Sequence, residues 1–120
     1  MTANAFVILY VEDDDFVRES VADMLGTVER RFVCVADGAG ARKALREHSV
    51  NLLMTDINLP DGSGLDVARE ALQQNPGLPV ILCSGYDVKD VVRSLGPTAH
   101  SLTKPFDLAE LEALVNRLAG

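Results

Sequence analysis

Cysteine, basic residues and long apolar runs are all scarce in this sequence of 120 residues. Its two cysteines, Cys34 and Cys83, each lie in a short apolar run and form no CxxC pattern, so we expect two buried free thiols without a redox or metal-binding role. His48 and His100 are equally isolated, with no histidine or cysteine at metal-ligand spacing, which argues against a zinc site.

The chain also lacks the sequence features of a membrane or secreted protein. No apolar stretch approaches the roughly 20 residues of a membrane-spanning helix, and residues 1–4 carry no basic region of a secretory signal. The formal net charge of -7 would repel nucleic acids and anionic membrane surfaces. We therefore expect a cytoplasmic protein that binds a cation or other proteins, without direct contact to nucleic acid or membrane.

Hydrophobic residues make up 48% of the sequence, which is enough for the core of one ordinary domain. No internal repeat, low-complexity tract or Pro/Ser-rich linker interrupts it, so we expect a single domain over residues 1–120. The sequence leaves open whether this domain is a whole protein or part of a longer one. Met1 favours a native start, while Gly120, directly after the last expected helix, fits either case.

Short apolar runs alternate five times with longer segments of helical period, which is the pattern of βα units around a parallel sheet. The expected strands cover about 6–11, 32–36, 52–55, 79–83 and 99–103, and the expected helices about 15–25, 41–45, 65–72, 88–95 and 108–118. Asp14 or Asp15 is placed to cap the first helix and Gly26 to end it. The segment 58–64 is rich in turn formers and predicts an exposed loop.

The fourth expected helix, 88–95, has more apolar residues than one face can hold. Val88, Val91, Val92 and Leu95 cannot all face inward if the helix is amphipathic. Its β-branched residues also make the helix intrinsically weak. We expect an exposed apolar remainder, which would be a candidate docking patch.

Polar residues follow four of the expected strands at the point where each strand ends. These residues are Glu12 and Asp13, Asp56, Ser84, and Lys104. In an open parallel sheet the carboxyl ends of the strands lie at one edge, and ligands bind there, where the winding direction reverses. The sequence thus predicts three carboxylates, a hydroxyl and an ammonium at one edge of the sheet.

Gathering three carboxylates at one edge is costly. Two like charges about 4 Å apart repel by roughly 4 kcal/mol at an effective dielectric constant near 20, so the cluster predicts a compensating cation. Taken singly, Glu12-Asp13 fits a helix cap, and Asp56 fits a buried structural carboxylate. Ser84 and Lys104 alone are an ordinary turn residue and surface charge. Their common position favours a site for phosphoryl chemistry.

Pro105 adds to this interpretation because proline restricts the residue before it. A proline at the end of a strand is often part of a fixed tight turn, which would aim Lys104 inward. The sequence also allows a cis bond between these two residues.

Four motifs follow one another along the chain: Val11-Glu12-Asp13-Asp14, Thr55-Asp56 with Leu59-Pro60-Asp61-Gly62-Ser63-Gly64-Leu65, Cys83-Ser84-Gly85, and Lys104-Pro105-Phe106. In this order and spacing they make the chain resemble, over essentially its whole length, the receiver domain of bacterial two-component response regulators. The resemblance implies a flavodoxin-like α/β fold, that is, a (βα)5 doubly wound parallel sheet with strand order 2-1-3-4-5 and helices on both faces.

The same resemblance implies a phosphorelay. Asp56 would accept a phosphoryl group from a phosphohistidine on a sensor histidine kinase or a histidine phosphotransfer protein, and Lys104 and Ser84 would contact the phosphoryl oxygens. The ligands implied for Mg²⁺, which prefers oxygen, are Glu12, Asp13, Asp56 and the backbone carbonyl of Asn58. Such a domain promotes only its own phosphorylation and dephosphorylation, so we expect no enzyme activity on a separate substrate.

Phosphorylation in this family shifts the domain between two states. The hydroxyl residue, here Ser84, moves toward the phosphate, and the surface of the fourth helix, fifth strand and fifth helix repacks to contact a downstream protein or a second copy of the chain. The sequence departs from the family three positions before Lys104, where Ser101 stands in place of the common Tyr or Phe. Tyr86 is a candidate substitute, and by hypothesis its ring shields the phosphate and slows hydrolysis.

Other interpretations compete with this one. The missing aromatic at Ser101 favours an interaction domain that keeps the fold but works without phosphorylation, although the intact acidic and lysine positions argue against it. Ser84-Gly85-Tyr86 resembles receiver domains attached to hybrid histidine kinases, which fits a receiver cut from a larger protein. A phosphatase with an aspartyl nucleophile would carry a second aspartate two residues after Asp56, where Asn58 stands. No P-loop motif supports nucleotide binding.

Overall fold

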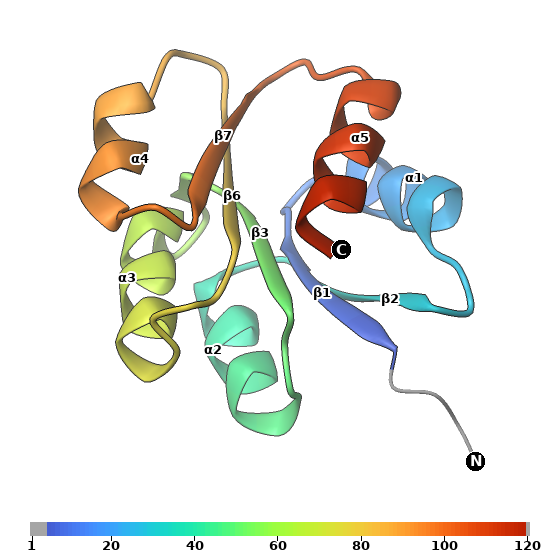
Figure 1. Ribbon diagram of the computed structural model, residues 1–120, viewed down its shortest axis with the longest axis horizontal. Coiled ribbons are helices and arrows are strands. Elements are labelled where there is room, and N and C mark those ends of the chain that lie inside the picture. The colour runs from blue at the N-terminus through green and yellow to red at the C-terminus, as the bar shows by residue number, and fades with distance from the viewer. Residues whose placement is uncertain (1–4, 120) are drawn as a thin grey trace.

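A computed structural model describes residues 5–119 and is shown in Figure 1. Five parallel strands form one sheet in the order β2-β1-β3-β6-β7. These strands are β1 (Phe6–Val11), β2 (Arg30–Val35), β3 (Leu52–Asp56), β6 (Val80–Ser84) and β7 (Ala99–Thr103). Without the two short strands of a hairpin described below, this is the order 2-1-3-4-5, so the predicted doubly wound α/β fold is confirmed.

The helices form one layer on each face of the sheet. They are α1 (Asp15–Leu25), α2 (Gly38–Glu47), α3 (Gly64–Gln74), α4 (Lys89–Leu95) and α5 (Leu108–Ala119). Helices α1 and α5 cover one face, and α2, α3 and α4 cover the other (Figure 1). Leu111 of α5 is buried in one apolar core and Val67 of α3 in the other. Within residues 5–119, no helix has both the length and the apolar character that crossing a bilayer requires.

The position of each strand in the sheet explains how clearly the sequence revealed it. Strands β3 and β6 are buried along their whole length because helices cover both of their faces, and they are therefore continuous apolar runs. Strand β2 lies at an edge and pairs only with β1. It begins at Arg30 and ends at Val35, whereas 32–36 was predicted, because charged side chains can reach solvent from an edge strand and interrupt the apolar pattern.

The two cysteines differ in exposure for the same reason. Cys83 lies in the central strand β6 and is buried, as predicted, but Cys34 lies on the edge strand β2 and is exposed, so the prediction was wrong for Cys34. Burial raises the pKa of the Cys83 thiol. Because the thiolate is the reactive form, this buried cysteine is chemically inert.

The segment after β3 is more ordered than the exposed loop that its turn formers predicted. Antiparallel strands β4 (Asn58–Leu59) and β5 (Gly62–Ser63) form a two-stranded hairpin. Gly62 has a φ of 151°, a backbone conformation that favours glycine. The hairpin leads directly into α3, so its geometry fixes how the chain passes from the end of β3 to the helix layer.

Helix α4 is short and packs more completely than predicted. Val88 precedes its seven residues as the N-cap and makes no side-chain capping bond. Val88 is buried, and Val91, Val92 and Leu95 are half-buried against the core. The prediction that part of this apolar set is exposed is therefore wrong. Because Val88 lies outside the helix, the three apolar residues inside it fit on one stripe.

Candidate functional site

The polar residues predicted at the strand ends lie at one edge of the sheet. Asp56 ends β3, and the strands on either side of β3 are β1, which is followed by Glu12, and β6, which ends at Ser84. Lys104 follows β7, the next strand across the sheet. Strands β1 and β3 are also where the winding direction reverses, so this edge is the expected ligand position of a doubly wound fold.

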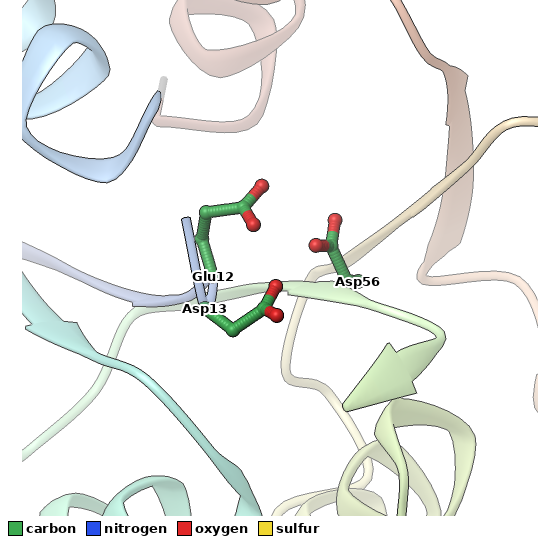
Figure 2. A group of neighbouring side chains, drawn as sticks. All are labelled: Glu12, Asp13 and Asp56. Carbon is green, nitrogen blue, oxygen red and sulfur yellow. The ribbon is translucent and has the colours of Figure 1, made fainter. Parts of the chain in front are cut away.

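Three carboxylates share a small volume at this edge. Glu12, Asp13 and Asp56 each offer an oxygen that lies within 4.8 Å of the others. Figure 2 shows the three side chains turned toward a common space, Glu12 and Asp13 from the end of β1 and Asp56 from the end of β3. Glu12 is 1% exposed and Asp56 is 7% exposed, while Asp13 is open to solvent. Such burial of ionised groups requires cationic or hydrogen-bonding partners.

Lys104 reaches into this cluster. Its Nζ donates to Glu12 Oε1 at 2.8 Å and to both carboxylate oxygens of Asp56 at 3.1 Å. The backbone N–H of Lys104 donates to the carbonyl of Ser84 at 2.7 Å, which ties the residue to the end of the neighbouring strand. The Lys104–Pro105 peptide bond is cis. The inward direction predicted for the lysine is therefore seen in the structure.

The charges at the site do not balance. Three carboxylates face one ammonium, that of Lys104. Within residues 5–119, no other side-chain cation forms an ion pair with them. The excess of two negative charges matches a divalent cation, and an all-oxygen donor set suits Mg²⁺. The residues present therefore fit the metal that the resemblance implied.

The pKa values reflect this crowding. Burial raises the pKa of Asp56 to about 7, and the nearby Glu12 adds to the rise while Lys104 opposes it. Burial also favours neutral Glu12, but Lys104 and the backbone N–H of Asp14 outweigh it and lower the pKa of Glu12 below its ordinary value. Burial works against the charged form of Lys104, yet the two carboxylates raise its pKa. Of the two buried carboxylates, Asp56 is therefore the one whose charged form is disfavoured by the excess negative charge.

The start of α3 packs directly against Asp56. A Cβ atom on Gly64 would lie 1.8 Å from the backbone carbonyl oxygen of Asp56, so only glycine allows this approach. The N–H of Gly64 donates to the carbonyl of Ile57 at 2.7 Å. Ser63 caps α3 by accepting from the N–H of Leu65 at 3.1 Å. The sequence placed Gly64 in a turn-rich segment but did not predict this contact.

Asn58 follows Asp56 along the chain, and Ser84 ends the strand that pairs with β3. Asn58 is the first residue of β4, two positions after Asp56, on the segment that leaves the site. Ser84 is 5% exposed, and its Oγ accepts a hydrogen bond from the backbone N–H of Tyr86 at 3.2 Å. The side chain of Tyr86 is 56% exposed. The hydroxyl thus lies at the base of a loop whose aromatic residue faces solvent.

Arg18 was missed in the sequence but supports the acidic segment. Its Nη1 donates to the backbone carbonyl of Glu12 at 2.7 Å, and its Nη2 forms an ion pair with Asp15. The guanidinium therefore ties the first turn of α1 to the turn that carries Glu12 and Asp13. Arg18 lies six positions after Glu12 and three after Asp15, but a backbone carbonyl acceptor gives no signal in the sequence, so no motif identified the residue.

Fold and site together define a class, the flavodoxin-like α/β domains with an acidic cluster and a lysine at the switch point of the sheet. A family model described as the response regulator receiver domain matches residues 8–116, and the chain belongs to this family.

Curated relatives agree with this assignment. Response regulator protein PmrA of Pseudomonas aeruginosa is 40% identical over 113 residues, which cover 92% of this chain and 51% of PmrA. The probable transcriptional regulatory protein TcrX of Mycobacterium tuberculosis is 34% identical over 116 residues, covering 92% and 50%. The response regulator receiver protein CpdR of Brucella abortus is 30% identical over 110 residues, covering 87% and 88%. The chain thus spans about half the length of PmrA and TcrX but most of CpdR.

Solved structures show the same fold. The chemotaxis response regulator CheY4 of Vibrio cholerae matches with a TM-score of 0.84 at 21% identity, covering 96% of this chain and 99% of that chain. A response regulator receiver protein of Sinorhizobium medicae matches with a TM-score of 0.84 at 27% identity, covering 95% and 94%. The predicted family and fold are both confirmed.

Proposed function

We propose that this domain is a phosphorylatable signalling switch. Asp56 accepts a phosphoryl group from a phosphohistidine on a sensor histidine kinase or a histidine phosphotransfer protein, in a reaction that depends on Mg²⁺ and takes place in the cytoplasm. The observation that carries the proposal is the cluster of Glu12, Asp13 and Asp56. Its three negative charges are balanced in part by one positive charge, that of Lys104.

The transfer is a displacement at phosphorus. A carboxylate oxygen of Asp56 forms the new O–P bond while the P–N bond to the partner's imidazole breaks with its electron pair staying on nitrogen. The ring leaves as neutral imidazole when its other nitrogen carries a proton, and otherwise its leaving nitrogen takes a proton from solvent. Charge spreads over three equatorial phosphoryl oxygens in such a transition state. When bound, Mg²⁺ would neutralise the acidic cluster and polarise a phosphoryl oxygen. Glu12, Asp13, Asp56 and the carbonyl of Asn58 are the groups that would hold it.

Lys104 and Ser84 supply the remaining contacts to the phosphoryl group. Lys104 already lies 3.1 Å from both carboxylate oxygens of Asp56, so its ammonium can follow one of them into contact with a transferred oxygen. Ser84 lies at the end of the strand that pairs with β3. Its hydroxyl can donate to a phosphoryl oxygen while its Oγ still accepts from the N–H of Tyr86. Lys104 and Ser84 thus stabilise the charge of the phosphoryl group by hydrogen bonds and form no covalent bond to it.

The proposed output is a change in the surface formed by α4, β7 and α5. An open hollow of about 550 Å³ lies between these elements, lined by Val92, Ser101 and Leu114 among others. Ser101 leaves this hollow without the aromatic ring common in the family. A downstream protein or a second copy of the chain would bind here, and the domain would act on no separate substrate.

Curated relatives named as DNA-binding regulators, such as NtrC of Escherichia coli, are matched over 24% of their length.

The test is phosphorylation by a small donor. The purified protein is incubated with acetyl phosphate and Mg²⁺, and its intact mass is compared with that of Asp56→Asn. Asp66→Asn, which changes an exposed carboxylate on α3, is the matched control. We expect one labile phosphate on the wild type and on Asp66→Asn, and none on Asp56→Asn or in the presence of a chelator. An unmodified wild type, even with a cognate kinase supplied, would favour an interaction domain that works without phosphorylation.

A further inference from the structure

Asp61, at the tip of the hairpin that follows Asp56, is bound to a distant helix. One carboxylate oxygen accepts from the backbone N–H of Gly38 at 2.8 Å, and the other accepts from the N–H of Ala39 at 2.9 Å. These two residues are the first of α2. The hairpin and the start of α2 are therefore joined by two hydrogen bonds to one charged group, although 23 positions separate Asp61 from Gly38.

The first turn of α2 is built to receive this carboxylate. It contains two glycines and no acidic residue of its own, so it is a weak helix start without a local charge to balance the helix dipole. Asp37 caps the next N–H, that of Gly40, at 2.7 Å. A Cβ on Gly38 would lie 3.1 Å from Asp61 Oδ1, so glycine leaves room for the approach. Two carboxylates thus satisfy the first three N–H groups of the helix.

A second contact fixes α2 relative to α3, the helix that the hairpin enters. Arg42 of α2 makes two parallel bonds to Glu70 of α3, from Nε to Oε1 and from Nη2 to Oε2, both at 2.8 Å. The hairpin is therefore linked to two helices that are also bound to each other. Its tip is tied to α2, and its end continues into α3 through Gly64, which is bonded to Ile57.

This anchoring acts on the backbone of the site. Between Asp56 and Asp61 the chain has only four residues, 57–60, and Asn58 is one of them. With one end of this segment fixed in β3 and the other fixed on α2, the backbone carbonyl of Asn58 has little freedom. A ligand that is held in place before the ion arrives loses less conformational entropy when it binds.

We propose that Asp61 is a positioning residue for Mg²⁺: by tying the hairpin tip to the N-terminus of α2, it holds the carbonyl of Asn58 where the ion needs it. This inference rests on the proposed function, because the Asn58 carbonyl is a ligand only if the site takes the metal. Consistent with firm binding, the N–H groups of Gly38 and Ala39 lower the pKa of Asp61, so the carboxylate stays charged at neutral pH.

The experiment measures Mg²⁺ affinity directly, by calorimetric titration of the metal-free protein, and needs no phosphorylation. Asp61→Ala removes both acceptors, and Asp61→Asn keeps one carbonyl oxygen. Asp37→Ala is the matched control, since it removes a carboxylate from the same helix start without touching the hairpin. Amide hydrogen exchange of Gly62 and Gly64 reports the mobility of the hairpin in the same proteins.

We expect Asp61→Ala to weaken Mg²⁺ binding roughly tenfold, the scale found when groups that orient metal ligands are removed. Asp61→Asn should fall between Asp61→Ala and the wild type, and hairpin exchange should be faster in Asp61→Ala. Asp37→Ala should lower the unfolding midpoint yet bind Mg²⁺ like the wild type.

Two results would overturn the inference while leaving the proposed function intact: wild-type affinity in Asp61→Ala, or an equal loss in Asp61→Ala and Asp37→Ala. The second result would mean that both residues act only by stabilising α2. If the wild type itself binds no Mg²⁺, the proposed function fails, and this role of Asp61 fails with it.

Discussion

The two sides of Asp56 are held very differently. On the α3 side, Gly64 packs against the Asp56 carbonyl, Ser63 caps the helix, and Asp61 is bound to α2. On the β6 side, the Ser84 hydroxyl is bonded within its own loop, and α4 has seven residues, none of them buried, with its first N–H, that of Lys89, bonded to the nearby Asp87. On the first side, the Asp61 carboxylate joins the hairpin to a distant helix, whereas on the second side the side-chain bonds of Ser84 and Asp87 are local and the Ser84 carbonyl is bonded to the Lys104 N–H.

The difference in contacts indicates a different role for each side of Asp56 in the proposed switch. Segments with few buried apolar contacts open at lower free energy than the core, and switching elements come from such segments. The α3 side carries the backbone carbonyl of Asn58, one of the groups that would hold Mg²⁺ and one that needs a constant geometry. The β6 side carries Ser84 and Tyr86, which would respond to the phosphoryl group. We therefore expect the α3 side to keep its geometry and the β6 side to rearrange.

Glycine substitutions should show the contrast most strongly. Gly64→Ala places a Cβ 1.8 Å from the Asp56 carbonyl, and we expect it to lower the free energy of unfolding by about 3 kcal/mol or more. Gly85→Ala, on the β6 side, meets no atom within 4 Å and should change it by about 0.5 kcal/mol at most. Urea unfolding of both variants measures the difference. Equal losses would remove the distinction between the two sides.

The charge of Asp56 should produce a smaller, pH-dependent effect in the metal-free protein. Its pKa is about 7 in the folded chain against an ordinary value of 3.8, so the folded state binds the proton more tightly. The resulting stabilisation is complete below about pH 4 and is lost as the pH rises toward 7. Asparagine cannot ionise, so Asp56→Asn should not lose stability in this pH range.

The variant should therefore exceed the wild type in stability by on the order of 2 kcal/mol at pH 8, with the gap closing near pH 4. Urea unfolding with a chelator present, repeated across this pH range, checks the prediction. Saturating Mg²⁺ should close the gap at pH 8 because it neutralises the cluster. A gap that does not change with pH would mean that the Asp56 charge costs the fold nothing.

The sequence was sufficient for the features that depend on local pattern and topology. Strands β3 and β6 are apolar throughout because both of their faces are covered, and the residues that follow such strands had to meet at one edge of a parallel sheet. That argument brought Glu12, Asp56 and Lys104 together before any distance was known. The same residues carried the family resemblance that the comparisons confirm.

The sequence was insufficient where a contact joins distant segments. The neighbours of Asp61 in the sequence indicate only a turn. Nothing near it indicates that its carboxylate accepts from the backbone N–H of Gly38. Cys34 was predicted from its apolar neighbours to be buried, but its strand lies at the edge of the sheet. In each case tertiary position overrides the local pattern.

The central claim is that a phosphoryl group on Asp56 is held by a rigid side and sensed by a mobile one. Amide hydrogen exchange, measured peptide by peptide before and after phosphorylation with acetyl phosphate and Mg²⁺, tests it most directly. We predict that exchange changes in β6, α4 and β7 and stays constant in the hairpin and α3. Exchange that is unchanged everywhere in the phosphorylated protein, or changed only in the hairpin and α3, would contradict the account.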